Sequence, residues 1–137
     1  MVIPKSYLAT SKRWVLLEHT GAPDDHLDRH FDLLLEEELA CRTWRLEKIP
    51  KPGDPPVELS PLADHHLKWL NKKESEVSGD RGKAKRVFKG TYKGPIPIQP
   101  NQPVHISLNS KDFIGILKIQ RNLTHFSSVH RSSINAY

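Results

Sequence analysis

The stretch RHFDLLLEEELACRTWRLEKIP, residues 29–50, decides the fold that the sequence predicts. Within it, HFDLLLEEE (30–38) and TWRLEKI (43–49) each have the length and apolar content of a strand, and only a short connection separates them. We therefore expect the two segments to pair as a β-hairpin. The Leu and Glu residues of 33–39 also suit a helix, so that alternative stays open for this segment.

Alternation along the first of these strands gives its two faces different chemistry. Side chains two residues apart in a strand point to the same side of the sheet. One face therefore carries His30, Asp32, Leu34 and Glu36, and the other carries Phe31, Leu33 and Leu35.

His30 and Asp32 offer an imidazole and a carboxylate on one face, and both are good ligands for a divalent cation. A third ligand from another strand would complete one side of the ion and leave positions for water and substrate. His19 ends the predicted strand 14–19 and is preferred over His26, because the segment around His26 is loop-like. The spacing H-x-D by itself is more typical of a surface pair than of a metal site.

The rest of the chain predicts more strands, punctuated by proline. Strands are expected at 83–92, 104–109 and 113–120, and 62–71 fits either a strand or a short helical turn. The prolines of 50–61 and 92–103 predict loops on the outside of the fold. Together these features predict an all-β protein, namely a small closed or partly closed β-barrel with proline-rich loops.

The domain organisation follows from length and from the end of the strand pattern. We expect a single domain over residues 1–137, with a core at about 13–121. From Asn122 the sequence is polar and rich in serine, so 122–137 is predicted to be a mobile tail.

Composition narrows the class of protein further. No apolar run approaches the roughly 20 residues of a membrane-spanning helix, and MVIPKSYLATSKRW lacks the apolar centre of a signal peptide. Cys41 is the one cysteine, so an intrachain disulfide is impossible, which fits a reducing compartment. We therefore expect a cytoplasmic protein with no membrane partner.

Positive charge is concentrated in RGKAKRVFKGTYK, residues 81–93. The net charge of the chain is +5, and this segment has no acidic residue. Clustered basic groups displace counterions from nucleic acid, so a phosphate-rich partner is one interpretation, and a solvated basic strand is the other. The basic residues are Arg81, Lys83, Lys85, Arg86, Lys89 and Lys93.

The order of several motifs carries a resemblance to a known family. WVLLEH, RHFDLLLE, CRTWRLEKIP, ADHHLKWL, SGDRGKAKRVFKGTY and ISLNSKDFIGILKIQ follow one another over roughly residues 13–121. This order resembles the 3′-phosphoesterase domain of bacterial DNA ligase D, and more closely the stand-alone proteins of that family. The resemblance implies a small β-barrel that binds manganese and removes a ribonucleoside and then a phosphate from 3′ ends of DNA or RNA. Its expected partners are such ends and the ligase machinery of DNA repair.

The resemblance also implies residue roles. His19, His30 and Asp32 would be the ligands of a divalent metal, expected to be Mn²⁺, inside the barrel. His65 matches a histidine that contacts the scissile phosphate, and Lys48 matches a lysine near the site; we assign both to catalysis. Trp69 is expected to bind substrate because of the resemblance. The other residues expected to bind substrate are chosen for their positive charge, namely Arg45, Arg81, Lys83, Lys85 and Arg86.

Two positions differ from the ligase D domain. Leu34 stands where that domain has a phosphate-binding arginine, and Trp69 stands where it has an active-site tyrosine. These differences leave open a module that binds nucleic-acid ends without catalysis. A more distant alternative is a non-haem iron oxygenase, whose site also uses two histidines and one carboxylate.

Overall fold

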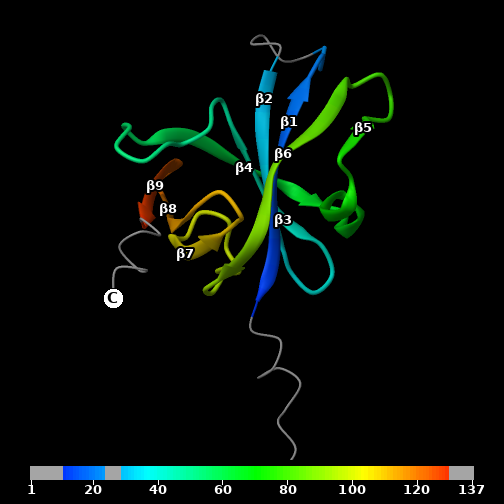
Figure 1. Cartoon of the computed structure of the whole chain (residues 1–137). Coiled ribbons are helices and arrows are strands. Elements are labelled where there is room, and N and C mark those ends of the chain that lie inside the picture. Colours follow the sequence, from blue (N-terminus) through cyan, green and yellow to red (C-terminus); the bar gives the residue numbers. More distant parts are fainter. Residues whose placement is uncertain (1–10, 24–28, 130–137) are drawn as a thin grey trace, which may run out of the picture.

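The computed structural model describes residues 11–23 and 29–129, and the regular structure of these residues is almost entirely β (Figure 1). One short 3-10 helix, η1 (Leu67–Asn71), follows the fourth strand. None of the helical structure in these residues has the length and apolar character needed to cross a membrane. The strands are β1 (Lys12–Thr20), β2 (Arg29–Glu36), β3 (Cys41–Leu46), β4 (Val57–His65), β5 (Glu74–Glu76), β6 (Lys83–Lys93), β7 (Val104–Asn109), β8 (Ile114–Gln120) and β9 (Leu123–Val129).

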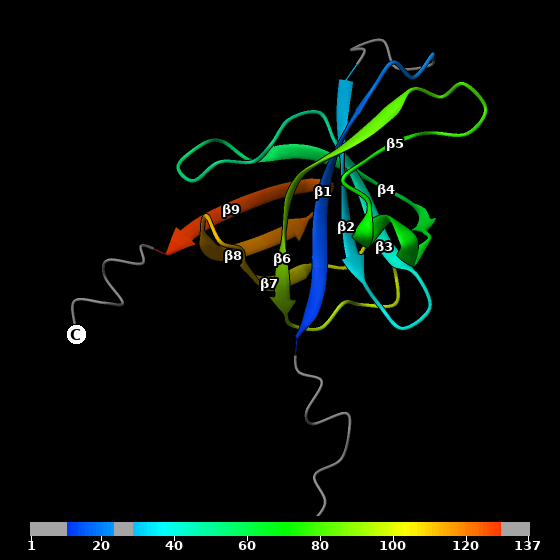
Figure 2. The same ribbon diagram turned by 45° about the vertical axis from the view of Figure 1, so that its right-hand side comes forward.

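Hydrogen-bonded strands form a ring. The sheet runs in the order β1-β2-β3-β4-β9-β8-β7-β6-β5, and β6 also pairs with β1, which closes the circle. Figure 2 shows β7, β8 and β9 side by side, on the opposite side of the molecule from the short green coil of η1. The pairing between neighbouring strands of the ring is shortest between β4 and β9, where it joins only Val57 to Thr124 and Glu58 to Leu123.

The strands expected from the sequence are confirmed, including the hairpin of β2 and β3. The helical alternative for 33–39 is wrong, because β2 continues to Glu36 and a turn follows. For 62–71, both expected structures occur in succession, since β4 ends at His65 and η1 begins at Leu67.

The predicted loop at 50–61 is too long, because β4 begins at Val57 and contains Pro61. Proline is tolerated in a strand whose N–H edge has no partner. Pro61 lies opposite Trp44 of β3, and the ladder of β4 with β9 does not reach it. The edge position of this part of β4 therefore explains why a proline does not end the strand.

The predicted tail at 122–137 also begins too early. Residues 123–129 form β9, which pairs with β8 along its whole length. Thr124 and Phe126 are buried, while the polar residues between and beyond them are more exposed. Because only alternate positions face the core, a half-buried strand can have a mostly polar sequence. Residues 130–137 lie outside the described part of the chain.

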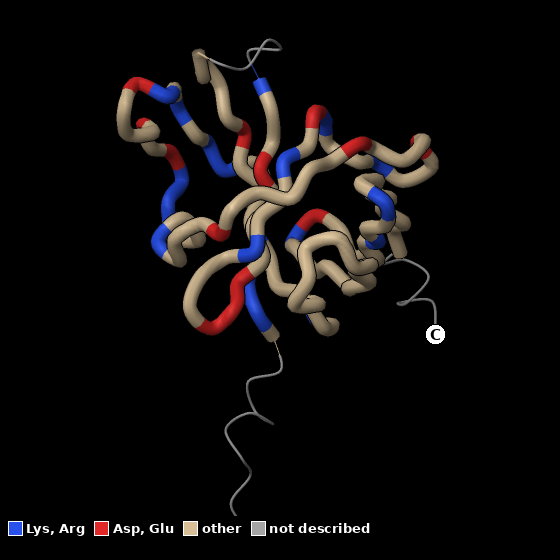
Figure 3. The backbone as a smooth tube through the Cα atoms, turned by 180° about the vertical axis from the view of Figure 1, so that it is seen from behind, with Lys and Arg blue, Asp and Glu red and all other residues tan. Residues whose placement is uncertain are grey.

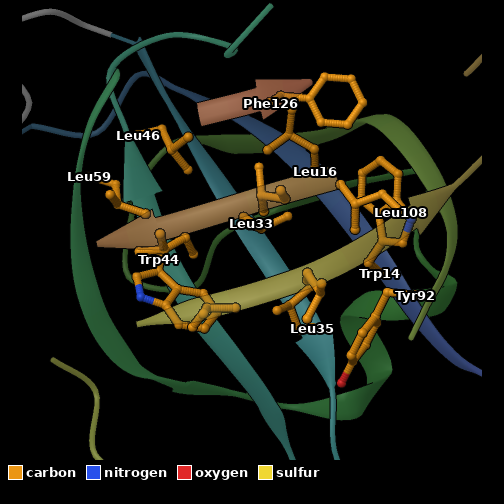
Figure 4. Packing of buried hydrophobic residues seen from close by; sticks show 14 of the residues in the cluster. Trp14, Leu16, Leu33, Leu35, Trp44, Leu46, Leu59, Tyr92, Leu108 and Phe126 are labelled. Atoms are coloured by element: carbon orange, nitrogen blue, oxygen red, sulfur yellow. The ribbon is translucent and has the colours of Figure 1, made fainter. Parts of the chain in front are cut away.

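The main hydrophobic core lies inside the ring. Every strand of the ring contributes to it, with Trp14, Phe31, Leu33 and Leu35 among its members (Figure 4). Burial of such side chains supplies the main favourable free energy of folding.

A second, smaller cluster lies on the other face of β1 and β2. Val15, Leu17 and Leu34 pack there against Leu70 of η1. His19, His30 and Asp32 belong to this same face, by strand alternation and register. The expectation of a metal site inside the barrel is therefore wrong: the large apolar side chains of β2 take the enclosed side, and the polar pair lies outside the ring.

Candidate metal centre

Strand register brings the three predicted metal ligands together. β1 and β2 are antiparallel, and His19 lies directly opposite His30, while Leu17 lies opposite Asp32. The exposed fractions of His19, His30 and Asp32 are only 8%, 3% and 5%. Polar groups buried to this degree need close partners, because unpaired burial is costly.

The distances between the side chains suit one shared cation. His19 Nδ1 lies 3.0 Å from His30 Nε2, and His30 Nε2 lies 3.6 Å from Asp32 Oδ2. One ligand atom from each residue falls within 4.8 Å of the others. Nitrogen and oxygen ligands bind divalent ions such as Zn²⁺ at about 2.0–2.2 Å, so the two ligand-atom distances of 3.0 Å and 3.6 Å are short enough for a shared ion. Two imidazoles and one carboxylate are therefore placed to hold a metal.

A backbone carbonyl orients the His19 ring. His19 Nε2 lies 2.5 Å from the carbonyl oxygen of Arg81. A carbonyl can only accept, so Nε2 carries the proton and donates, which leaves the Nδ1 lone pair directed toward His30. Metal-binding histidines commonly have such a partner on the other ring nitrogen, because it fixes the tautomer.

Gly82 allows the Arg81 carbonyl to lie this close to β1. Its φ is +91°, and a Cβ at this position would come within 2.0 Å of the Thr20 carbonyl oxygen. Only glycine combines that backbone angle with so close an approach. The turn after β5 is therefore held against the end of β1, beside His19.

The carboxyl group of Asp32 is held in its charged form. Burial by itself would raise its pKa, but the hydrogen bond with His30 and the charges of His30, Arg45 and His65 lower it below its ordinary value. The Arg45 guanidinium contributes at close range, with Nε 3.4 Å from Asp32 Oδ1. Asp32 can therefore offer a negatively charged ligand at neutral pH.

A pocket of about 620 Å³ opens above the three ligands. Of the residues expected to act on substrate, His65, Arg45, Trp69 and Arg81 line it. The Arg81 side chain folds back on its own turn, with Nε donating to the Ser78 carbonyl oxygen at 2.7 Å. Arg81 thus contributes its backbone to this site more directly than its guanidinium.

Four other expected residues do not line this pocket. Lys48 lies just beyond β3, and Lys83 forms an ion pair with Glu74 at 3.2 Å. Lys85 lies opposite Glu74 in the strand ladder, and Arg86 lines a different groove. The basic segment of β6 therefore does not form one positive surface at the mouth of the histidine pocket.

Sequence reasoning missed Glu47, Asp64 and His66, which also line the pocket. Alternation along the chain from β3 could have identified Glu47. Glu47 is two residues from Arg45 and so shares its face, whereas Lys48 is three residues away and faces the other side. His66 also caps η1, since its Nδ1 accepts from the Lys68 backbone N–H at 3.2 Å. No spacing in the sequence marks that cap as part of a pocket.

Leu34 is fully buried, with an exposed fraction of 0%, and belongs to the cluster beneath η1. It does not line the pocket, so the position at which the resemblance leads one to expect an arginine is a packing position in this structure. Arg45, from the next strand, is the guanidinium closest to Asp32 among the ion pairs of the described residues. His26, the alternative to His19, lies outside the described residues.

No known family model matches the chain, and no curated protein matches its sequence.

Proposed function

We propose that this protein is a metal-dependent phosphoesterase that acts on 3′ ends of DNA or RNA during end healing. The observation that carries the proposal is the convergence of His19, His30 and Asp32 at the base of a pocket that also holds His65 and Arg45. A phosphate ester needs such a combination, because its oxygens are negative and its leaving group must be neutralised. The choice of 3′ ends, and of repair ligases as partners, rests on the sequence resemblance to ligase D phosphoesterase domains.

His19, His30 and Asp32 would hold the metal, for which the resemblance favours Mn²⁺. When bound, a divalent ion polarises a phosphoryl oxygen and lowers the pKa of a coordinated water. The protein contributes a fixed tautomer at His19 and a charged carboxylate at Asp32, both set by their hydrogen-bond partners. The burial of all three side chains keeps competing water away from the ligands.

His65 would orient the phosphate or protonate its leaving oxygen. Its Nδ1 lies 3.1 Å from the Ala63 carbonyl oxygen, so Nδ1 donates there. In the imidazolium form Nε2 would carry a second proton, which it could donate to a phosphate oxygen or to the leaving oxygen. Arg45 would bind a phosphate oxygen, since 43% of its side-chain surface is exposed. Trp69 forms part of the wall, and Lys48 is assigned no step because it does not line the pocket.

The closed order of strands supports the same proposal, because the resemblance implies a small β-barrel and a strand ring is compatible with one. A cytoplasmic location is part of the proposal, and the unpaired, buried Cys41 agrees with it.

A module that binds 3′ ends without cleaving them is the second candidate. The observation that favours it is Leu34, which removes a guanidinium from the ligand strand and fills its place with apolar packing. Such a module would keep the metal site and the pocket and would retain the product.

Release of inorganic phosphate from a 3′-phosphorylated oligonucleotide tests the proposal. We expect release with Mn²⁺, none in EDTA, and none from the same oligonucleotide phosphorylated only at its 5′ end. Asp32→Asn should abolish release, and Asp54→Asn, at an exposed site outside the pocket, should not. Binding of the 3′-phosphorylated oligonucleotide without turnover, with every divalent metal, would support the binding module instead.

A further inference from the structure

We propose that a second groove, beside the metal pocket, binds the phosphates of a nucleic-acid strand upstream of its 3′ end. This basic groove has a volume of about 770 Å³ and is bounded by β1, β6, η1 and the turn between β7 and β8. The inference deepens the proposed function, because the strand that it binds would be the one whose end enters the metal pocket.

The basic groove is lined by five basic residues. Arg13 lines it but is paired with Glu36 at 3.1 Å, and Asp112 is its one acidic lining residue. In residues 11–23 and 29–129, no acidic side chain forms an ion pair with the other four basic residues of the groove. These unpaired cations are Lys73, Arg86, Lys89 and Lys111.

The charges of the groove come from different parts of the chain. Figure 3 shows basic residues, with acidic ones among them, along β5 and β6 and along the segment that leads into β5. Lys73 belongs to the segment before β5. Its carbonyl oxygen accepts a hydrogen bond from the Arg86 N–H at 2.8 Å, which holds this segment against β6. Lys111 faces them from the turn after β7. Charges that surround a groove from separate elements attract an extended polyanion better than a single basic strand does.

One aromatic ring lies at the surface of the groove. Phe88 lines the groove and is partly exposed, whereas Trp14 and Val15, which also line it, are almost fully buried. The Phe88 ring packs edge-on against Phe113, with centroids 5.3 Å apart, so its position is fixed. Aromatic faces within a positive groove are typical of sites for single-stranded nucleic acid, because every base can stack on them. An acidic peptide would meet the same charges but has no planar group to place on Phe88.

The groove and the metal pocket lie on the same pair of strands. His19 pairs with Ala84 in the pocket, and four residues earlier Val15 pairs with Lys89 in the groove. At about 3.3 Å per residue the two pairs are about 13 Å apart along β1. Trp69 borders the pocket and the next residue, Leu70, borders the groove, so η1 adjoins both.

Binding of a single strand to the metal-free protein tests the inference without the metal site. The probe is a fluorescent oligothymidylate of about eight nucleotides with a 3′-hydroxyl, in EDTA. We expect binding that weakens with salt. The double variant K89Q/K111Q should reduce the slope of log affinity against log salt by about 1.4, at about 0.7 per lost phosphate contact. The matched control K51Q/K118Q removes the same charge from exposed sites outside the groove and should leave the slope unchanged.

Two results would overturn the inference. One is an equal change of slope in K89Q/K111Q and K51Q/K118Q, which would mean that only net charge matters. The other is competition by an octaglutamate peptide as effective as that by unlabelled oligothymidylate. The outcomes also separate the two proposals. Groove binding without phosphate release contradicts only the proposed function, whereas phosphate release with unaltered binding in K89Q/K111Q contradicts only this inference.

Discussion

Nδ1 of His19 and Nε2 of His30 face each other across β1 and β2 at a distance of 3.0 Å. The rings are nearly perpendicular, with an interplanar angle of 73°. Because His19 Nε2 donates to the Arg81 carbonyl, Nδ1 has no proton of its own. Either a shared proton or a bound metal ion would satisfy both nitrogens. The nearby Asp32 carboxylate favours a divalent ion over a proton, because the ion has the larger positive charge.

The turn that orients His19 should control metal affinity from outside the ligand set. Gly82→Ala would place a Cβ within 2.0 Å of the Thr20 carbonyl, so the turn must move and take the Arg81 carbonyl away from His19. We expect Mn²⁺ affinity to fall by about 10- to 100-fold, as for other changes to the partners of metal ligands. The control is Gly53→Ala, since Gly53 also has a positive φ, +83°, but nothing lies within 4 Å of the added Cβ. Equal Mn²⁺ affinity in the two variants would show that the carbonyl has no influence.

His65 should affect turnover without affecting the metal. His65→Ala removes a pocket group that is outside the cluster of metal ligands. A general acid contributes about 10²- to 10⁴-fold, so phosphate release should fall by at least about 100-fold at unchanged Mn²⁺ affinity. His105→Ala, at an exposed site on β7, serves as the control. A His65→Ala protein with wild-type turnover would remove His65 from the mechanism.

Leu34 should not accept the arginine of the ligase D domain. Leu34 is completely buried beneath η1, so Leu34→Arg would bury a guanidinium among apolar side chains. We expect the free energy of unfolding to fall by about 3–5 kcal/mol, the cost of an uncompensated buried charge. Leu34→Met should cost less than about 1.5 kcal/mol, because it nearly conserves volume. Urea unfolding measures both, and a stable Leu34→Arg protein would mean that η1 can move aside.

The ion pair of Glu36 with Arg13 should make part of the stability depend on pH. Burial alone would raise the pKa of Glu36, but hydrogen bonds from the side chain and backbone of Arg13, and its charge, lower it below 4.5. A lowered folded-state pKa stabilises the protein above about pH 4.5, and this contribution is lost as the pH falls through the folded-state value.

Glu36→Gln should therefore lower the unfolding free energy at neutral pH by at most about 1 kcal/mol and have less effect in acid. Urea unfolding from neutral pH down to about pH 3 measures this difference. Glu38→Gln changes an exposed neighbour without an ion pair in the described residues and should have little effect at either pH. A Glu36→Gln penalty that grows as the pH falls would contradict the assignment.

The sequence predicted that His19, His30 and Asp32 would lie together, and it predicted the surroundings of this cluster less well. Alternation in HFDLLLE requires His30 and Asp32 to share a face, and that relation is local. The face itself was assigned wrongly, because the choice between the enclosed and the outer side depends on long-range packing. Phe31 and Leu33 pack with residues from every strand of the ring, and η1 covers the other side.

Strand pairing also decided which distant residues reached the site. Arg45 enters because β3 places it opposite Asp32, and the Arg81 carbonyl enters because β6 returns beside β1. A cluster of basic residues in the sequence did not become one surface, since Lys83 is paired with Glu74 of β5. Register and turn geometry, which a single sequence does not reveal, therefore determine which charges face the pocket.

The central claim is that His19, His30 and Asp32 hold one divalent metal ion. Titration calorimetry of Mn²⁺ into metal-free protein tests it most directly, with His30→Ala, Asp32→Asn and His105→Ala as variants. Asp32→Asn keeps an oxygen donor but loses the charge, and His30→Ala removes a ligand outright. The account predicts one ion per chain for the wild type and for His105→Ala, and a loss of affinity above about 100-fold for the other two. Mn²⁺ binding by His30→Ala and Asp32→Asn at the wild-type affinity would contradict it.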